Sequence, residues 1–151
     1  DILRRASYKK AEYKCEICGD NGKNQGYKHE VECHEIWDYD DTLKIQILRG
    51  LISLCPRCHQ IKHFGRTSAI GLQAEAFKHM EKVNNWNHKQ CVTHLAESMT
   101  EWAERSKFKW NIDLSVLYEN FEIPKDLIIE AQSKDRVVEN KYKKRKKRKK
   151  K

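Results

Sequence analysis

Alternating apolar and polar positions predict a β-hairpin in the first third of the chain. Along residues 29–37 the side chains alternate between two faces, with Val31 and Cys33 on one of them, which is the period of a strand. The acidic residues 38–41 predict a turn that ends this strand. A second strand is predicted over residues 44–54, where isoleucines alternate with polar side chains and Gly50 predicts an interruption.

Apolar residues at helical spacing predict helices in much of the remaining chain. A short helix is expected to begin at Cys55, with Pro56 in its first turn, and to end at Gly65. Residues 108–117 alternate again and predict either a strand or an extended arm. Further helices are expected over residues 1–14, 72–83 and 92–103.

Composition indicates a small core and a strongly basic end. Hydrophobic residues make up 38% of the 151 positions and charged residues 35%, and a core that small often needs a metal or another cross-link. Ten of the 31 Lys and Arg lie in residues 141–151, which leaves 21 basic against 22 acidic residues elsewhere. The net charge of +9 is therefore a property of the tail. No apolar run reaches the roughly 20 residues of a membrane span.

Four of the six cysteines form two Cys-x-x-Cys pairs, Cys15 with Cys18 and Cys55 with Cys58. Each pair can place two sulfurs on one ion, and two pairs complete a tetrahedral structural Zn²⁺ site. Since the chain shows no secretory signal, zinc is favoured over disulfides. We expect an intracellular setting: the cytoplasm or nucleoid, or the nucleus if the source is eukaryotic.

Three histidines are expected to converge beside the zinc. His59 and His63 lie four positions apart on the predicted helix, and His34 lies on the first strand of the hairpin. They could hold a second divalent cation, or they could be ordinary surface or core histidines. Three imidazoles suit Zn²⁺, Ni²⁺, Co²⁺ or Mn²⁺ better than Mg²⁺. The other histidines, His29, His79, His88 and His94, show no such convergence and are expected to be ordinary.

Three segments and one histidine form a single motif: Cys15-Glu16-Ile17-Cys18, Glu32-Cys33-His34-Glu35-Ile36, Leu51–His59 and His63. This motif resembles the zinc-containing, McrA-like branch of the HNH endonuclease family. The resemblance covers residues 8–65 and implies a ββα-metal core, a catalytic divalent cation (Mg²⁺, Mn²⁺, Ni²⁺ or Zn²⁺) and hydrolysis of phosphodiester bonds in DNA.

In that family two adjacent residues on the first strand supply a metal ligand and the general base. This pair can be aligned with the chain in two registers. In one, His34 is the general base and Cys33 takes the metal position. In the other, His34 binds the metal with His59 and His63, and Glu35 is the base; Ile36 favours this register. The resemblance thus implies catalytic roles for His34, Glu35 and His59. The Asn in the middle of the family motif falls on Gly50.

Nucleic acid, DNA first, is the expected partner. The tail would bind phosphates without reading bases, and Lys62 could contact another phosphate. The tail candidates are Lys143, Lys144, Arg145, Lys146, Lys147 and Arg148. An alternative is a catalytically silent zinc module that binds nucleic acid or a ribonucleoprotein, and a protein partner could dock on the helices of residues 67–106.

The predicted fold class is α+β, a small zinc-stapled ββα-metal (HNH) core with additional C-terminal helices and a disordered basic tail. The core is expected over residues 1–66, a helical extension over 67–123 and the basic tail over 124–151.

Overall fold

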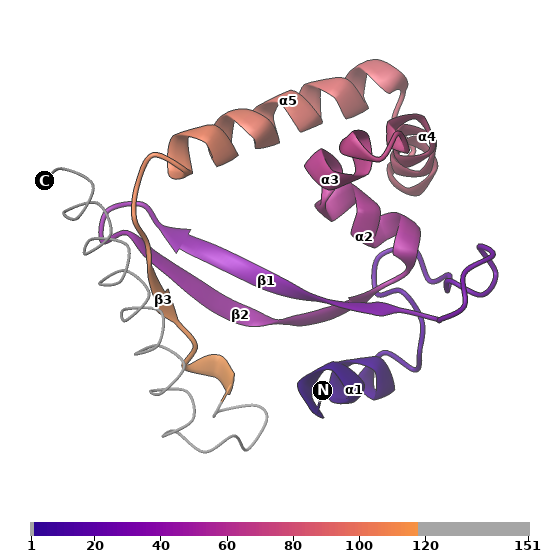
Figure 1. Cartoon of the computed structure of the whole chain (residues 1–151), viewed down its shortest axis with the longest axis horizontal. Coiled ribbons are helices and arrows are strands. Elements are labelled where there is room, and N and C mark those ends of the chain that lie inside the picture. Colours follow the sequence, from indigo (N-terminus) through magenta and orange to yellow (C-terminus); the bar gives the residue numbers. More distant parts are fainter. Residues whose placement is uncertain (1, 118–151) are drawn as a thin grey trace, which may run out of the picture. The chain divides into compact units, whose positions relative to one another are not determined.

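The computed structural model describes residues 2–117, and these residues fold as a mixed α+β protein, as predicted (Figure 1). The predicted nucleic-acid-binding residues of the tail, 143–148, lie outside the described residues. No helix within 2–117 has both the length and the apolarity that a bilayer crossing requires. The elements, in chain order, are α1 (Ile2–Lys10), β1 (Glu32–Asp40), β2 (Ile45–Leu54), α2 (Pro56–Lys62), α3 (Phe64–Ala69), α4 (Gln73–Asn84), α5 (His88–Arg105) and β3 (Asn111–Asp113).

The chain divides into two compact units. Among the described residues, the first contains residues 2–36 and Leu51–Lys109, and the second contains Trp37–Gly50 and residues 110–117. The strands β1 and β2 each begin in one unit and end in the other. Within the second unit β3 pairs with β2 in parallel, with Ile45 opposite Asn111, which confirms the strand that alternation predicted for this segment.

The first strand continues through the acidic segment, so the predicted break at Asp38 is wrong. β1 ends at Asp40, whose Oδ1 accepts hydrogen bonds from the backbone N–H groups of Thr42 (2.9 Å) and Leu43 (2.8 Å). A short carboxylate side chain therefore closes the turn after the strand instead of ending the strand early. The predicted interruption at Gly50 is also wrong, because β2 is continuous from Ile45 to Leu54.

The helix after Cys55 ends earlier than predicted. Cys55 is the N-cap and Pro56 lies in the first turn, but the helical backbone stops at Lys62, and His63 has φ −108° and ψ 45°. Gly65 lies inside the next helix, α3, and does not end α2. The hydroxyl of buried Thr67 donates to the backbone carbonyl of Gln60 at 2.7 Å, which holds α3 against the end of α2.

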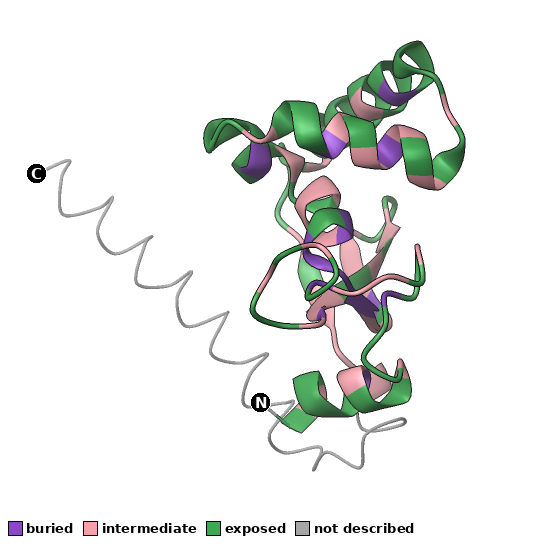
Figure 2. Ribbon diagram, turned by 90° about the vertical axis from the view of Figure 1, so that its right-hand side faces the viewer, coloured by how far each residue is buried: buried purple, intermediate pink, exposed green. Residues whose placement is uncertain are grey.

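The two longer helices form where helical spacing predicts them. Their apolar stripes were expected to pack in the core, which is wrong for the second helix, because Val92, Met99 and Trp102 are exposed. The α4 helix ends at Asn84, and the α5 helix begins with a capping box in which the Asn87 and Gln90 side chains bind each other's backbone N–H groups. Only a narrow stripe of these helices is buried, including Ala76, Met80 and Cys91, and most of their surface is exposed (Figure 2).

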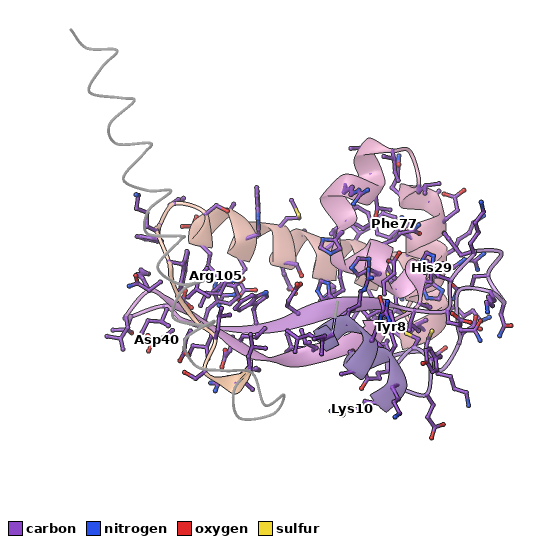
Figure 3. All side chains as sticks on the ribbon, turned by 60° about the horizontal axis from the view of Figure 1, so that its bottom comes forward. Tyr8, Lys10, His29, Asp40, Phe77 and Arg105 are labelled. Atoms are coloured by element: carbon purple, nitrogen blue, oxygen red, sulfur yellow. The ribbon has the colours of Figure 1, made fainter. Side chains whose placement is uncertain are left out.

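The core of the first unit surrounds the cysteines. Leu54 and Cys55 are fully buried and pack with Cys15 and Cys58. The helix α1 is fixed to β2 by a hydrogen bond between the buried hydroxyls of Ser7 and Ser53 at 2.7 Å. In Figure 3 Tyr8 lies towards the strands, whereas Lys10 lies on the outer side of the same helix.

Close packing around Gly22 leaves no room for a side chain at this position of the core. A Cβ added there would lie 2.2 Å from the carbonyl oxygen of His29 and 2.8 Å from Cδ of Pro56, so the backbone would have to move. We expect Gly22→Ala to lower the free energy of unfolding by about 1–3 kcal/mol in denaturant titrations. Gly65→Ala is the matched control, because its Cβ meets no atom within 4 Å and alanine favours a helix by roughly 0.5–1 kcal/mol. Equal stability of the two variants would contradict the packing at Gly22.

Candidate metal centres

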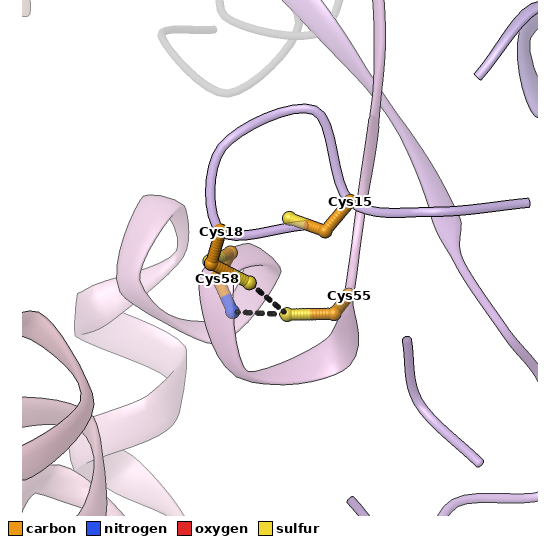
Figure 4. A group of neighbouring side chains, drawn as sticks. All are labelled: Cys15, Cys18, Cys55 and Cys58. Carbon is orange, nitrogen blue, oxygen red and sulfur yellow. Dashed lines mark hydrogen bonds between the residues drawn. The ribbon is translucent and has the colours of Figure 1, made fainter. Parts of the chain in front are cut away.

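The four paired cysteines converge into one group, as the sequence predicted (Figure 4). Their sulfur atoms all lie within 4.8 Å of one another, and Sγ of Cys18 lies 3.5 Å from Sγ of Cys55. A tetrahedral zinc with Zn–S bonds of about 2.3 Å separates its sulfurs by about 3.8 Å. The cysteine cluster (Cys15, Cys18, Cys55 and Cys58) therefore has the ligand type and the spacing to bind a metal such as zinc.

Backbone hydrogen bonds hold the first Cys-x-x-Cys turn against the end of β2. The N–H of Glu16 donates to the carbonyl of Ser53 at 2.9 Å, and the N–H of Ser53 donates to Oε2 of Glu16 at 2.6 Å. In the second turn Sγ of Cys55 accepts from the N–H of Cys58 at 3.4 Å. These bonds fix the two turns that carry the sulfurs.

The thiols influence one another's ionisation. Hydrogen bonds from the thiols of Cys55 and Cys58 lower the pKa of Cys15. Burial raises the pKa of Cys18 to about 12, and hydrogen bonding to Cys15 raises the pKa of Cys58. Several thiolates in one buried group repel each other unless a cation is present. The cluster thus suits a divalent ion better than it suits four free thiols.

His79 of α4 contacts the cysteine cluster, which the sequence did not predict. Its Nε2 lies 3.2 Å from Sγ of Cys58, and burial lowers the pKa of His79. The expectation that His79 is an ordinary histidine is therefore wrong. No spacing rule could reveal it, because packing of α4 against α2 creates the contact.

His34, His59 and His63 also converge and form the histidine cluster. The ring centroids lie 5.3 Å apart for His34 and His59, 5.0 Å for His34 and His63, and 4.5 Å for His59 and His63. One nitrogen from each ring falls within 4.8 Å of the others. His63 reaches this position from the cap of α2 and not from a further helical turn.

Glu32 orients one ring of the histidine cluster. Its Oε2 lies 2.5 Å from Nδ1 of His59, and its Oε1 lies 2.9 Å from Nε2 of His29. Since Nδ1 of His59 is held by a carboxylate, Nε2 is the nitrogen that could bind a cation. Sequence reasoning missed Glu32, although strand alternation places it on the face of β1 that also carries His34.

His34 has the properties of a ligand without its ion. Its Nδ1 is buried and has no hydrogen-bond partner among residues 2–117, an arrangement that is rare and costly in folded proteins. Burial, with smaller contributions from the neighbouring His59, His63 and Lys62, lowers the pKa of His34 to about 4. The ring is therefore neutral near pH 7, and a neutral imidazole is the form that binds metals.

Glu35 lies on the opposite face of β1 from His34 by strand alternation, and its side chain is exposed. Its charge still acts on the cluster, because it opposes the lowering of the pKa values of His34 and His59. Cys33 is half-buried, burial raises the pKa of its thiol, and it belongs to neither metal-binding group in the described residues.

A small pocket of about 190 Å³ opens beside the histidine cluster. His59 and His63 line it together with Arg66 of α3. On the rim, Nε2 of Gln60 donates to the hydroxyl of Tyr27 at 3.0 Å. Arg66, which the sequence did not single out, thus places a permanent cation next to the imidazoles, and Lys62 is exposed at the end of α2.

Comparisons with family models, with curated proteins and with solved structures gave no match to this chain. What the two clusters do must therefore be inferred from their side chains.

Removing the His79 imidazole should weaken zinc binding at the cysteine cluster. We expect His79→Ala to lower the zinc affinity by about 10- to 100-fold, because an outer hydrogen bond orients the thiolate of Cys58 and moderates its charge. Competition with a chromophoric chelator measures the effect. His88→Ala is the control, since His88 pairs with Glu81 at the surface. An unchanged affinity in His79→Ala would show that the contact with Cys58 has no role in zinc binding.

Glu32→Gln should affect only the other cluster. Loss of the carboxylate that holds Nδ1 of His59 is expected to weaken binding of Ni²⁺ or Zn²⁺ to the histidine cluster by about 10- to 100-fold, while zinc loaded at the cysteine cluster is expected to stay in place. Isothermal titration of the zinc-loaded protein separates the two sites. Glu30→Gln is the matched control, because Glu30 pairs with the exposed Lys23. Loss of the tight zinc in Glu32→Gln would contradict the independence of the two sites.

Proposed function

We propose that this protein is an HNH-type, metal-dependent endonuclease that hydrolyses phosphodiester bonds in DNA. The observation that carries the proposal is His34, whose buried, unpartnered Nδ1 lies in a cluster with His59 and His63. Phosphodiester hydrolysis needs a cation near the phosphate and a group that accepts a proton from water. The histidine cluster and the carboxylates beside it are of the types that this chemistry uses.

We assign His34, His59 and His63 to the catalytic cation, which when bound would stabilise the charge that develops on the phosphate. A pKa of about 4 makes His34 a weak base at neutral pH, because the best general bases have a pKa near the working pH. The ligand role therefore suits His34 better than the base role. The register that goes with this choice names Glu35 as the base, but Glu35 lies on the opposite face of β1 from His34, so this choice leaves the base unassigned. Cys33, outside both clusters, has no metal role in it.

Cations near the cluster would hold the DNA backbone. Arg66 lines the small pocket beside His59 and His63, and a guanidinium can bind two phosphate oxygens at once. Lys62 is close enough to lower the pKa of His34, so its charge also reaches the site. The exposed Lys9 and Lys10 of α1 and the tail residues 143–148 would add contacts that carry no sequence information.

A catalytically silent zinc module that binds nucleic acid or a ribonucleoprotein is the second candidate. Gly50 favours it, because the Asn of the family motif falls on this residue and glycine offers no amide to support a base. Packing does not impose the glycine, since a Cβ at Gly50 would meet no atom within 4 Å.

A plasmid-nicking assay separates the two candidates. The zinc-loaded protein is incubated with supercoiled DNA and Mg²⁺, Mn²⁺, Ni²⁺ or added Zn²⁺, and conversion to the open-circular form is measured. We expect nicking with at least one of the transition metals and a loss of about 100-fold or more in His34→Ala, since metal and acid–base contributions are of this size. His88→Ala should nick at the wild-type rate.

Two results would count against the proposal in different ways. Nicking that survives His34→Ala would mean that the histidine cluster is not the active site. Plasmid binding without nicking by any metal would favour the silent module.

A further inference from the structure

A groove of about 530 Å³ lies between the α2–α3 segment and α5. Its volume falls within the range of about 300–1,000 Å³ that is typical of small-ligand pockets. The lining is mainly apolar, and Lys62 and Arg66 add cations at the α2–α3 side. The residues that define it are Lys62, Phe64, Arg66, Met80, Met99 and Trp102.

The α5 side of the groove exposes large apolar side chains. Trp102 is 63% exposed and Met99 43% exposed, on a helix whose surface is otherwise mostly polar. Exposed apolar side chains that lie together along one groove are a feature of binding sites. Trp102 offers a flat face that a planar group could cover.

The charges at the groove favour an anionic occupant. Lys62 and Arg66 line it, and no Asp or Glu is among its described lining residues. Both cations lie at the α2–α3 side, which is the side that carries His63. A planar apolar group with a phosphate attached at that side would match the groove.

The groove is continuous with the candidate active site. His63 and Arg66 line both the groove and the small pocket beside the histidine cluster. A phosphate held at the cluster would therefore present one of its own nucleosides to the groove.

We propose that this groove binds a nucleobase next to the phosphate at the histidine cluster, with the base stacked on Trp102. The position of the phosphate rests on the proposed function. Stacking on an aromatic side chain is tolerant of sequence, because every base has a π-face. A base within a duplex is already stacked on its neighbours and is not available. The groove therefore selects single-stranded or locally unpaired nucleic acid.

The test measures binding, so that it does not depend on cleavage. A fluorescein-labelled single-stranded deoxyoligonucleotide and its abasic counterpart are titrated with the full-length, zinc-loaded protein at about 0.2 M salt, which weakens contacts made only to phosphates. Gel analysis after each titration confirms that the oligonucleotide is intact. We expect the wild type to bind the base-containing strand about tenfold more tightly, which is a typical effect of one stacked base.

The variants locate the base. Trp102→Ala should bind both strands equally, whereas Trp102→Phe should keep most of the preference because it retains an aromatic face. Val92→Ala is the matched control, since Val92 is an exposed apolar residue of α5 that does not line the groove. Unchanged circular dichroism shows that each variant is folded.

The outcomes separate this proposal from the nuclease proposal. A base preference that persists in Trp102→Ala, or no preference in the wild type, would overturn the groove as a base site and leave a protein partner as the better occupant. A preference lost in Trp102→Ala together with no nicking by any metal would support base binding and overturn the nuclease.

Discussion

The convergence of the two Cys-x-x-Cys turns is the interaction on which the rest of the first unit depends. Its core is small, and Cys15, Cys55 and Cys58 make up much of it. Four sulfurs in an apolar setting contribute little cohesion by themselves and repel one another once ionised. A cation bound between them would remove that repulsion, and the free energy of metal binding would add to the free energy of folding.

The cysteine cluster also determines where the histidines lie. Cys58 and His59 are adjacent in α2, so an ion that fixes one residue restricts the other. The hydrogen bond between His79 and Cys58 connects α4 to the same point, and Thr67 holds α3 against the end of α2. The direction of α2, and with it the opening of the groove towards α5, thus follows from contacts made around the sulfurs.

The polar residues around the histidine cluster have two different roles. Glu32 holds His59 and so selects which ring nitrogen remains available, whereas Arg66 and Lys62 put positive charge on the side where a phosphate would approach. His34 stays neutral because it is buried beside other imidazoles. His34 and His59 are half-buried and His63 is exposed, so a cation held by the cluster would be reached both by protein ligands and by a group from solvent.

The sequence by itself determined the secondary-structure classes, the two cysteine pairs and the spacing of His59 and His63, because each of these depends on spacing within one element or one turn. The approach of His34 from β1 was expected only because the hairpin connects that strand to the second cysteine pair. It did not place the end of α2 at Lys62, since a helix end depends on what packs beside it and not on the nearest glycine. Only the tertiary structure decided that His79, Glu32, Arg66 and Trp102 belong near the two clusters. Contacts between elements depend on interhelical and sheet packing, and a pattern along one strand or helix carries no information about the side chain that meets it from another.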